Sequence, residues 1–317
     1  MIDMSLKNEI LNYLSAHGDE YISGEALAKK FNKSRTAVWK AVKSLQNDGI
    51  KIDAVTNRGY RYSDKNDVVS AEAIKQLVDF DCDVVYYDSI DSTNTQAKRL
   101  ITEGMDRVTL ITAAEQTSGR GRQGKSFYSP KNTGIYLSLV VHPMDSLQNS
   151  VGITTASSVA VCRAIEKVTP LHPKIKWVND VYVNDKKVCG ILTEAVTDFE
   201  TQTVTSVIIG VGVNITTSEF PDDVKNASSL GTQVKRADLT AQIANELYKV
   251  YNCSFEDIID YYRSHSMVIG KDIVYIKNGE KFFAKAVGID SQGGLQIIDE
   301  NSNQTTLRSG EITVRIK

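Results

Sequence analysis

The sequence predicts a multidomain α+β protein, and three observations carry that prediction. Residues 1–65 combine short amphipathic helices with a hairpin, as in a winged helix-turn-helix domain. Residues 66–268 mix longer strands and helices, which predicts a central α+β domain on a mixed or mainly antiparallel sheet. Residues 269–317 hold only short strands and predict a small β-barrel. A chain of 317 residues is long enough for two or three such domains.

The amino-acid composition argues against several classes of protein. The net charge of −2 gives no general preference for nucleic acid, so any basic surface must be local. The four cysteines are scattered without a C-x-x-C pair, which predicts reduced thiols in a cytoplasmic protein and no zinc site or disulfide framework. No signal peptide opens the sequence, and no apolar run approaches the roughly 18 residues of a membrane span.

The first domain is predicted from its helix caps and its hairpin. Apolar residues within 10–14 have helical spacing, Ser23 is expected to cap a second helix, and Ser34 a third. Two short helices joined by a tight turn form a helix-turn-helix pattern. The segments IKIDAV (50–55) and YRYS (60–63) are expected to pair as a wing.

The charge of this domain favours duplex DNA. Six cations and no acid occur between Lys29 and Lys43. Arg35 and Thr36 are expected to read base edges, while the lysines that follow contact phosphates. The alternative is a solvated basic face, against which the wing argues. The predicted DNA-binding residues are Ser23, Lys33, Ser34, Arg35, Thr36, Lys40, Lys43 and Arg58.

The central domain is assembled from alternating strands and helices. Strands are expected at 83–88, 108–114, 134–143, 174–183, 186–196 and 204–215, and helices at 92–104, 149–168 and 238–264. GIYLSLVVHP (134–143) alternates as a half-buried strand does. A hairpin turn is expected at Asn184-Asp185.

The stretch GRGRQGKS (119–126) matches both the Walker A pattern and G-x-G-x-x-G. Both motifs need a helix directly after the loop, but SFYSPKNTG, with Pro130, leads into another strand. Both phosphate-loop readings are therefore rejected. A long cationic loop remains, which is expected to be mobile when empty and ordered by an anion. A plain surface loop is the alternative.

Several segments together resemble the biotin protein ligases. They are DSIDSTN (88–94), EQTSGRGRQGKSFYSP (115–130), GIYLSLVV (134–141), KWVNDVYVNDKKVCGIL (176–192), GVGVN (210–214) and LRSGEI (307–312). With the winged helix present, the resemblance is to the bifunctional bacterial kind, which is ligase and biotin operon repressor in one, and it covers essentially the whole chain. It implies a class II synthetase-like central domain and an SH3-like C-terminal barrel.

The resemblance also implies a reaction and its partners. Biotin and ATP, with Mg²⁺, give biotinyl-5′-AMP and pyrophosphate, and the adenylate then acylates a lysine of a biotin carboxyl carrier domain. With biotinyl-AMP as corepressor, a homodimer binds operator DNA. A carboxylate and an α-phosphate repel each other in a poorly solvated site, so the main chemical requirement is cations.

Site residues follow from the resemblance, position by position. The implied catalytic residues are Lys187, Arg122 and Asp180, with Asp180 orienting the acceptor lysine. The implied biotin-binding residues are Ser92, Thr93, Asn94, Gln116, Arg120, Gly121, Arg122, Lys187, Gly190, Leu192 and Gly210. The implied nucleotide-binding residues are Arg120, Arg122, Phe127, Asn179, Lys187 and Asn214, and no metal-binding residue is expected.

Simpler interpretations stay open beside these. Ser92 and Thr93 also suit a helix N-cap, and Trp177 suits the core. The chain departs from the family pattern at Val178, where proline is usual, and at Phe127, where tryptophan is common. Two other functions compete with the ligase and repressor: a regulator that only senses biotin, and a ligase for lipoate or another acid.

Overall fold

The computed structural model divides into two compact units, Met1–Val68 and Val69–Lys317. It describes residues 6–18, 20–47, 50–63, 66–142, 150–198, 200–222, 224, 226–277, 279–308 and 312–314. Within those ranges no helix is both long and apolar enough to cross a membrane. Each unit is built on its own hydrophobic core.

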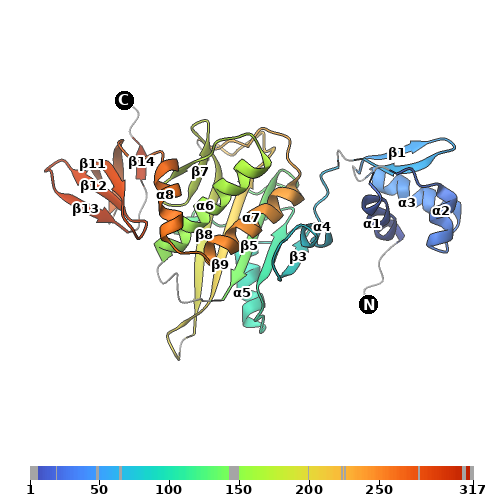
Figure 1. The fold of residues 1–317 in the computed structure, drawn as a ribbon, viewed down its shortest axis with the longest axis horizontal. Helices are drawn as coiled ribbons and strands as arrows, with labels where there is room; N and C mark the ends of the chain where they lie inside the picture. The colour runs from blue at the N-terminus through green and yellow to red at the C-terminus, as the bar shows by residue number, and fades with distance from the viewer. Residues whose placement is uncertain are drawn as a thin grey trace. The chain divides into compact units, whose positions relative to one another are not determined.

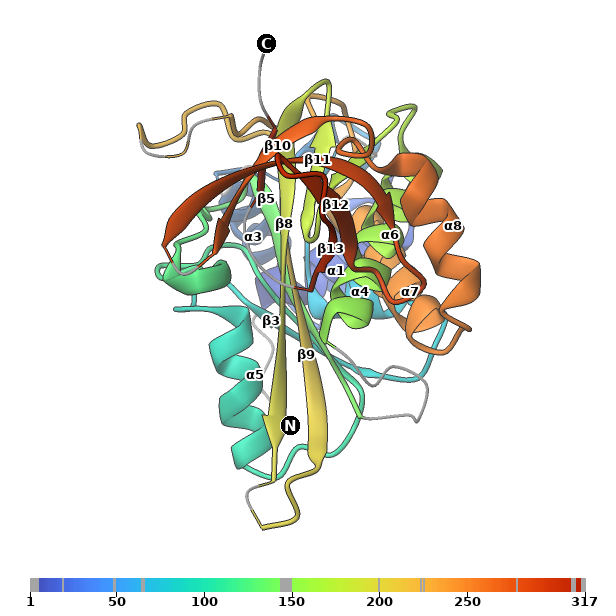
Figure 2. The ribbon, with the colours of Figure 1, turned by 90° about the vertical axis from the view of Figure 1, so that its left-hand side faces the viewer.

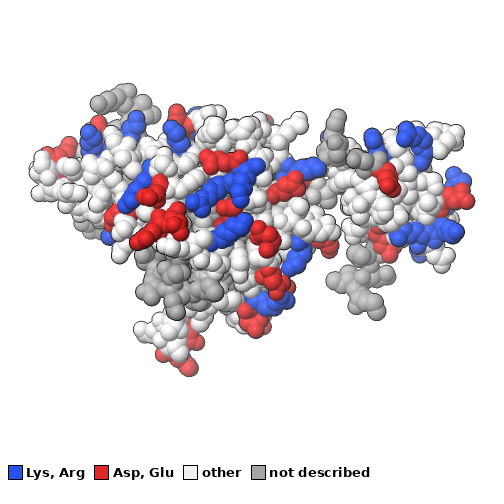
Figure 3. Space-filling model, viewed as in Figure 1, with Lys and Arg blue, Asp and Glu red and all other residues white. Residues whose placement is uncertain are grey.

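The first unit is a helix-turn-helix with a wing. Its elements are α1 (Leu6–Ala16), α2 (Gly24–Lys30), α3 (Arg35–Asn47), β1 (Ile52–Val55) and β2 (Gly59–Tyr62). Both expected caps are present: Ser23 Oγ accepts from the Ala26 N–H at 3.0 Å, and Ser34 Oγ accepts from the Ala37 N–H at 3.1 Å. Groups of Lys and Arg lie on its visible surface (Figure 3). The predicted arrangement of this domain is confirmed.

The wing is attached to the turn before α2. Ile22 and Tyr60 exchange two backbone hydrogen bonds, at 2.8 and 2.9 Å. Gly59 has φ +107°, and a Cβ there would lie 2.2 Å from the Ile22 carbonyl oxygen. Only glycine fits this contact, because both the dihedral angle and the space exclude a side chain.

A mixed seven-stranded sheet forms the centre of the second unit, in the order β3-β4-β5-β9-β8-β7-β6. Only β3 and β4 pair in parallel among these neighbours. The strands are β3 (Asp83–Tyr87), β4 (Thr109–Ala113), β5 (Gly134–Val141), β6 (Lys174–Lys176), β7 (Asp180–Val183), β8 (Lys186–Thr197) and β9 (Val204–Asn214). The helices are α4 (Ala71–Lys75), α5 (Thr93–Thr102), α6 (Ser150–Val168), α7 (Arg236–Tyr251) and α8 (Glu256–His265).

Helices cover both faces of this sheet (Figures 1 and 2). Figure 2 shows α5 on one side of β8 and β9, and α6, α7 and α8 on the other. Strand β5 was expected to be half-buried, but all eight of its residues are buried. Ile135, Leu137 and Leu139 join the main core, while Val140 packs in a second cluster with Ala97 of α5. The expectation was wrong because this strand is central and covered on both faces.

Two expected elements are each divided in the structure. Residues 174–183 form two strands, separated by a turn in which the Trp177–Val178 peptide is cis. The expected helix 238–264 is interrupted after Tyr251, and Ser254 Oγ then accepts from the Glu256 N–H at 3.3 Å. Residues 252–255 leave the helical path, so two helices form in place of one. The expected hairpin at Asn184-Asp185 is confirmed, and both residues have positive φ.

The chain ends in a five-stranded antiparallel sheet, in the order β13-β12-β11-β10-β14. Its strands are β10 (Asp272–Lys277), β11 (Glu280–Ile289), β12 (Leu295–Asp299), β13 (Gln304–Leu307) and β14 (Ile312–Val314). Trp177 Nε1 donates to the Gly293 carbonyl at 2.9 Å and so joins this sheet to the central one. Part of the LRSGEI motif, residues 309–311, lies outside the described residues.

Candidate functional site

Sheet register brings the predicted site residues together on the face that carries α5. Residues directly opposite each other on neighbouring strands share a face. One row across the sheet is Ser138, Gly210 and Leu192. The next row is Tyr136, Gly212, Gly190 and Asp180. Four strands thus contribute to one surface.

Two glycines in these rows make room for site side chains. A Cβ at Gly210 would lie 2.2 Å from Asn94 Oδ1, and one at Gly212 would lie 2.4 Å from the Phe127 ring. Phe127 also approaches Gly190, where a Cβ would lie 3.3 Å from its ring. These glycines therefore let Asn94 and Phe127 lie directly on the sheet.

Lys187 reaches this face because β8 contains a bulge. Lys187 and Gly190 are three residues apart, so an uninterrupted strand would place them on opposite faces. The register between β7 and β8 shifts at Val181/Tyr182, which opposes Lys187 to Tyr182. A Cβ on Gly190 would lie 3.5 Å from Lys187 Nζ, which confirms that the two share a face. The bulge redirects the lysine into the site.

The inner end of the site is a hydrogen-bonded group of amides and hydroxyls. Gln116 Oε1 accepts from the Thr93 backbone N–H at 2.9 Å, and Gln116 Nε2 donates to Ser129 Oγ at 2.9 Å. Ser138 Oγ donates to Asn94 Oδ1 at 2.6 Å. Ser129 and Ser138 were missed by the sequence reasoning, since nothing but the fold brings them to Gln116 and Asn94.

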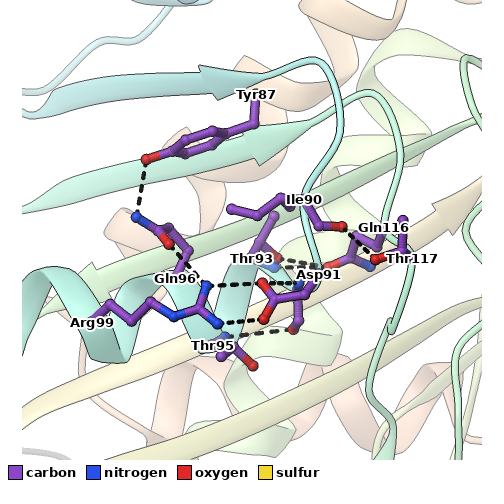
Figure 4. Close-up of polar contacts among 10 residues, drawn as sticks. Tyr87, Ile90, Asp91, Thr93, Thr95, Gln96, Arg99, Gln116 and Thr117 are labelled. Atoms are coloured by element: carbon purple, nitrogen blue, oxygen red, sulfur yellow. Dashed lines mark hydrogen bonds and ion pairs between the residues drawn. The ribbon is translucent and has the colours of Figure 1, made fainter.

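The turn that begins α5 is held from several directions (Figure 4). Arg99 donates to both oxygens of Asp91, with one contact at 3.0 Å, and hydrogen bonding from Arg99 keeps the pKa of that carboxyl below its usual value. Ser92 caps the helix with a long contact of 3.5 Å to the Thr95 N–H. Ser92 is therefore a helix cap, as the simpler interpretation held, and it also lines the site cavity.

The cationic loop folds back on itself. Isolated antiparallel bridges join Gln116 to Ser129 and Arg120 to Ser126, around a short 3-10 turn, η1 (Arg122–Gly124). Backbone hydrogen bonds such as Gly121 N–H to Lys125 O (2.7 Å) close the loop. An extended segment leads from Lys125 into β5, so the rejection of both phosphate-loop motifs is confirmed.

Each of three site cations contacts an acceptor within the protein. Lys187 Nζ lies 2.7 Å from Asp180 Oδ1. Arg122 Nη1 donates to Asn179 Oδ1 at 3.1 Å. Arg120 Nη1 lies 3.5 Å from Glu194 Oε1. An anionic ligand that enters here exchanges these contacts for its own.

Glu194 is a further residue that the sequence reasoning missed. Burial by itself would raise the pKa of this carboxyl, but hydrogen bonds from Lys98 and Asn94 and the charge of Arg120 hold it below the usual value. Asn94 Nδ2 donates to Glu194 Oε2 at 2.9 Å. The ionised carboxylate thus connects the amide end of the site to Arg120.

Most of the predicted site residues line one cavity of about 280 Å³. All the predicted biotin-binding residues line this cavity. Other residues that line it include Ser126, Leu137, Lys176, Trp177 and Ile312. Ile312 comes from the C-terminal sheet. Asn214 is not part of this cavity; it lines a second one of about 440 Å³, together with Phe127, Lys187 and Phe220. Asn214 Oδ1 is buried and has no hydrogen-bond partner among the described residues.

The predicted DNA-binding residues lie on the first unit. Arg35, Thr36, Lys40 and Lys43 are exposed along α3, and Lys33 is exposed just before it. Arg58, on the wing, lies over the Tyr21 ring, 4.3 Å from its centroid. Ser23 and Ser34 are helix caps. Within the described residues, no group of three or more His, Cys, Asp or Glu is arranged to hold a metal ion.

Three family profiles match successive parts of the chain. An HTH domain matches residues 7–61, the biotin/lipoate A/B protein ligase family matches residues 86–214, and the biotin protein ligase C-terminal domain matches residues 268–315.

Whole-chain relatives agree with these matches. The bifunctional ligase/repressor BirA of Bacillus subtilis (strain 168) is 32% identical over 97% of this chain and 98% of its own length. The Escherichia coli (strain K12) protein of the same description is 26% identical, over 95% of each chain. Among solved structures, biotin protein ligase from Aquifex aeolicus in complex with biotin and ATP has a TM-score of 0.62 and 28% identity, over 74% of this chain and 99% of that one.

Proposed function

Because this chain belongs to the bifunctional biotin ligase/repressor family, we propose that it performs both activities with the residues described above. As a ligase it activates biotin with ATP to biotinyl-5′-AMP and transfers the biotinyl group to a lysine of biotin carboxyl carrier protein. As a repressor it binds operator DNA of biotin synthesis or transport genes, with biotinyl-AMP as corepressor.

The observation that carries the ligase function is the meeting of Arg120, Arg122 and Lys187 at one cavity. In the first step a biotin carboxylate oxygen bonds to the α-phosphorus, and the bond to the β-phosphate oxygen breaks, releasing pyrophosphate. Both reactants are anions, so cations held at the point of approach lower the barrier. Lys187 is the most firmly held of the three, since it stands on a strand and not on the loop.

The second step needs a neutral amine and an oriented acceptor. The carrier lysine attacks the acyl carbon, AMP leaves with the bonding electrons, and the amine loses a proton. We assign Asp180 the orientation of that amine. Its Oδ1 lies 2.7 Å from Lys187 Nζ, so it stands beside the position of the mixed anhydride.

The amide and hydroxyl end of the cavity suits the ureido ring of biotin. Thr93, Asn94 and Gln116 present donors and acceptors there, and Ser129 fixes the orientation of Gln116. Gly190, Gly210 and Leu192, which come from two adjacent rows of β8 and β9, supply a flat wall for the bicycle. Ser92 and Gly121 also line the cavity.

The second cavity suits the nucleotide. Asn214 offers a buried acceptor there, and Phe127 forms a wall common to both cavities. Asn179, beside Arg122, contributes from the first cavity. Asp180 is the one carboxylate lining the first cavity in the described residues, and it contacts Lys187. Magnesium bound to ATP would therefore be held by phosphate and water oxygens.

The repressor function rests on the first unit. Its cationic third helix has the width of the major groove, and a homodimer would present two such helices to a palindromic operator. Ordering of the cationic loop by biotinyl-AMP is the proposed link between ligand and dimer. Operator affinity that ignores biotin and ATP would contradict this link.

The same proposal includes the fold type and the bounds of each domain. We propose that the central domain is class II synthetase-like and that the C-terminal sheet is an SH3-like barrel. The proposed domains are 1–65, 66–268 and 269–317. With a carboxylase carrier domain and operator DNA as the proposed partners, we propose that the protein acts in the cytoplasm.

One experiment separates the competing functions. The protein is incubated with ATP, Mg²⁺, a carrier domain and either biotin, lipoate or octanoate, and acyl transfer is followed by mass spectrometry. Transfer of biotin alone is expected. Transfer of another acid in its place would identify a different ligase, and binding of biotin without any transfer would leave only a sensing regulator.

A further inference from the structure

Helix α3 carries a tryptophan on its outward face. Val38, Val42 and Leu45 pack into the core of the first unit, whereas Trp39 between them is 54% exposed. No ring contact, cation contact or hydrogen bond to its indole occurs within the part of the chain that the structure describes. Trp177, by contrast, is 3% exposed and donates a hydrogen bond to Gly293, so the folded chain does bury a structural tryptophan.

Trp39 is surrounded by the cations predicted to contact DNA. Arg35 and Lys43 stand one turn before and after it on the same row of the helix, and Thr36 and Lys40 form the adjacent row. All four are exposed, and no described ion pair involves the three cations. The indole is therefore the one large apolar group in the centre of a positive, polar face.

A solitary exposed apolar residue is ordinary on a protein surface, so exposure alone decides nothing. What distinguishes Trp39 is its position in the centre of the positive face of α3. In the major groove the apolar feature of the base pairs is the thymine C5-methyl group, while the groove walls are phosphates. Lys40 and Lys43, bound to the phosphates, would hold the central indole against the base edges.

We infer that Trp39 is a specificity-determining residue that recognises thymine methyl groups in the major groove of the operator. This inference rests on the proposed repressor function. Lys40 and Lys43 supply affinity for any duplex, and the indole adds a preference for thymine to the base contacts expected of Arg35 and Thr36. Trp39 differs in this from Lys43, which is placed for phosphate contact.

The test begins with a random-sequence duplex library, selected by the full chain in the presence of biotin and ATP. Wild-type protein is expected to enrich a palindromic site with a thymine that the Trp39→Ala variant no longer selects. On the enriched site Trp39→Ala should bind at least about tenfold more weakly, while its affinity for unrelated duplex and the salt dependence of binding stay unchanged. Trp39→Phe should retain part of the preference.

Two matched controls locate the effect. Lys43→Ala should weaken binding to all duplexes and reduce the salt dependence by about one ion per half-site. Replacing the selected thymine by uracil removes only the methyl group, and should weaken wild-type binding about fourfold per half-site. The same replacement should leave Trp39→Ala unaffected.

The outcomes test two claims separately, the role of Trp39 and the repressor function. Identical enriched sites and equal affinities for wild type and Trp39→Ala would overturn the role of Trp39. So would a loss that is equal for all duplexes and accompanied by a lower dimer population, since that would make Trp39 a contact between copies. A wild-type protein that enriches no site would instead overturn the repressor function, and biotin transfer by every variant shows that the second unit is intact.

Discussion

At the scale of single residues, Lys187 and its neighbour Lys186 form a natural comparison. Both stand at the start of β8, but Lys187 lines both cavities, whereas Lys186 is exposed and lines neither. Lys187→Gln is expected to slow adenylation by about 10²- to 10³-fold, because it removes a positive donor at the developing charge. Pyrophosphate exchange with biotin and ATP measures this step.

The control for that prediction is Lys186→Gln, which should exchange pyrophosphate at the wild-type rate. Equal losses in the two variants would show that general surface charge matters and that the cavity position of Lys187 does not. Biotin binding in the absence of ATP should survive in both variants, since the amide end of the site is untouched.

Asp180 allows the two chemical steps to be separated. Asp180→Asn keeps the size of the side chain but removes the charge that we assign to orienting the acceptor amine. Transfer from preformed biotinyl-AMP to the carrier should slow by at least about tenfold, with a smaller effect on pyrophosphate exchange. Asp185→Asn, in the exposed hairpin turn, should leave both rates unchanged. Equal loss of both steps in Asp180→Asn would refute the separate role.

At the scale of elements, the wing depends on one glycine. In Gly59→Ala the new Cβ would meet the Ile22 carbonyl oxygen at 2.2 Å, and φ +107° would strain any side chain. We expect the first unit to lose more than about 2 kcal/mol of stability and the operator affinity to fall. Thermal unfolding and operator titration measure these losses, while biotin transfer stays at the wild-type rate.

Gly24→Ala is the matched control for the wing. Its Cβ would stand 3.4 Å from the Tyr60 ring, an ordinary contact, and the position begins α2. Alanine suits a helix, so stability should hold or rise slightly. A Gly59→Ala protein as stable as Gly24→Ala would mean that the wing does not need its contact with Ile22.

The elements also show why some predictions failed. The alternation of β5 was read correctly, but burial on its second face depends on α5, which is distant in sequence. The break between α7 and α8 was missed because residues 238–264 were expected to form one helix, and no side-chain cap marks the start of α8. The bulge beside Lys187 has no signal in the sequence, since it depends on how β8 pairs with β7.

At the scale of the whole molecule, the cores protect three of the four cysteines. Cys82, Cys162 and Cys189 are buried, and burial raises the pKa of each thiol, so almost none is thiolate at pH 8. Cys253 is exposed. A thiol reagent at pH 8 should therefore modify one cysteine quickly in the native chain and all four after denaturation.

Mass mapping identifies the modified positions, and Cys253→Ser should abolish the fast reaction. Fast modification of Cys162 or Cys189 would contradict the burial of the contact between α6 and β8. Ligase activity should persist after Cys253 is modified, since that residue lies after α7 and lines neither described cavity.

The sequence by itself determined the helix caps, the wing, most of the strands and the family. These depend on local chemistry or on motifs, as Ser23, Ser34 and Gly59 show. It also located the cationic loop and excluded the phosphate-loop motifs, because a helix cannot follow Lys125 in that sequence.

Only the tertiary structure decided how the site is assembled. The rows through Ser138, Gly210 and Gly212 depend on pairing between strands far apart in the chain, which sequence spacing does not encode. Glu194 and Ser129 became site residues because the fold places them against Arg120 and Gln116. The physical reason is that register and burial are set by non-local packing, while caps and turns are set by neighbouring residues.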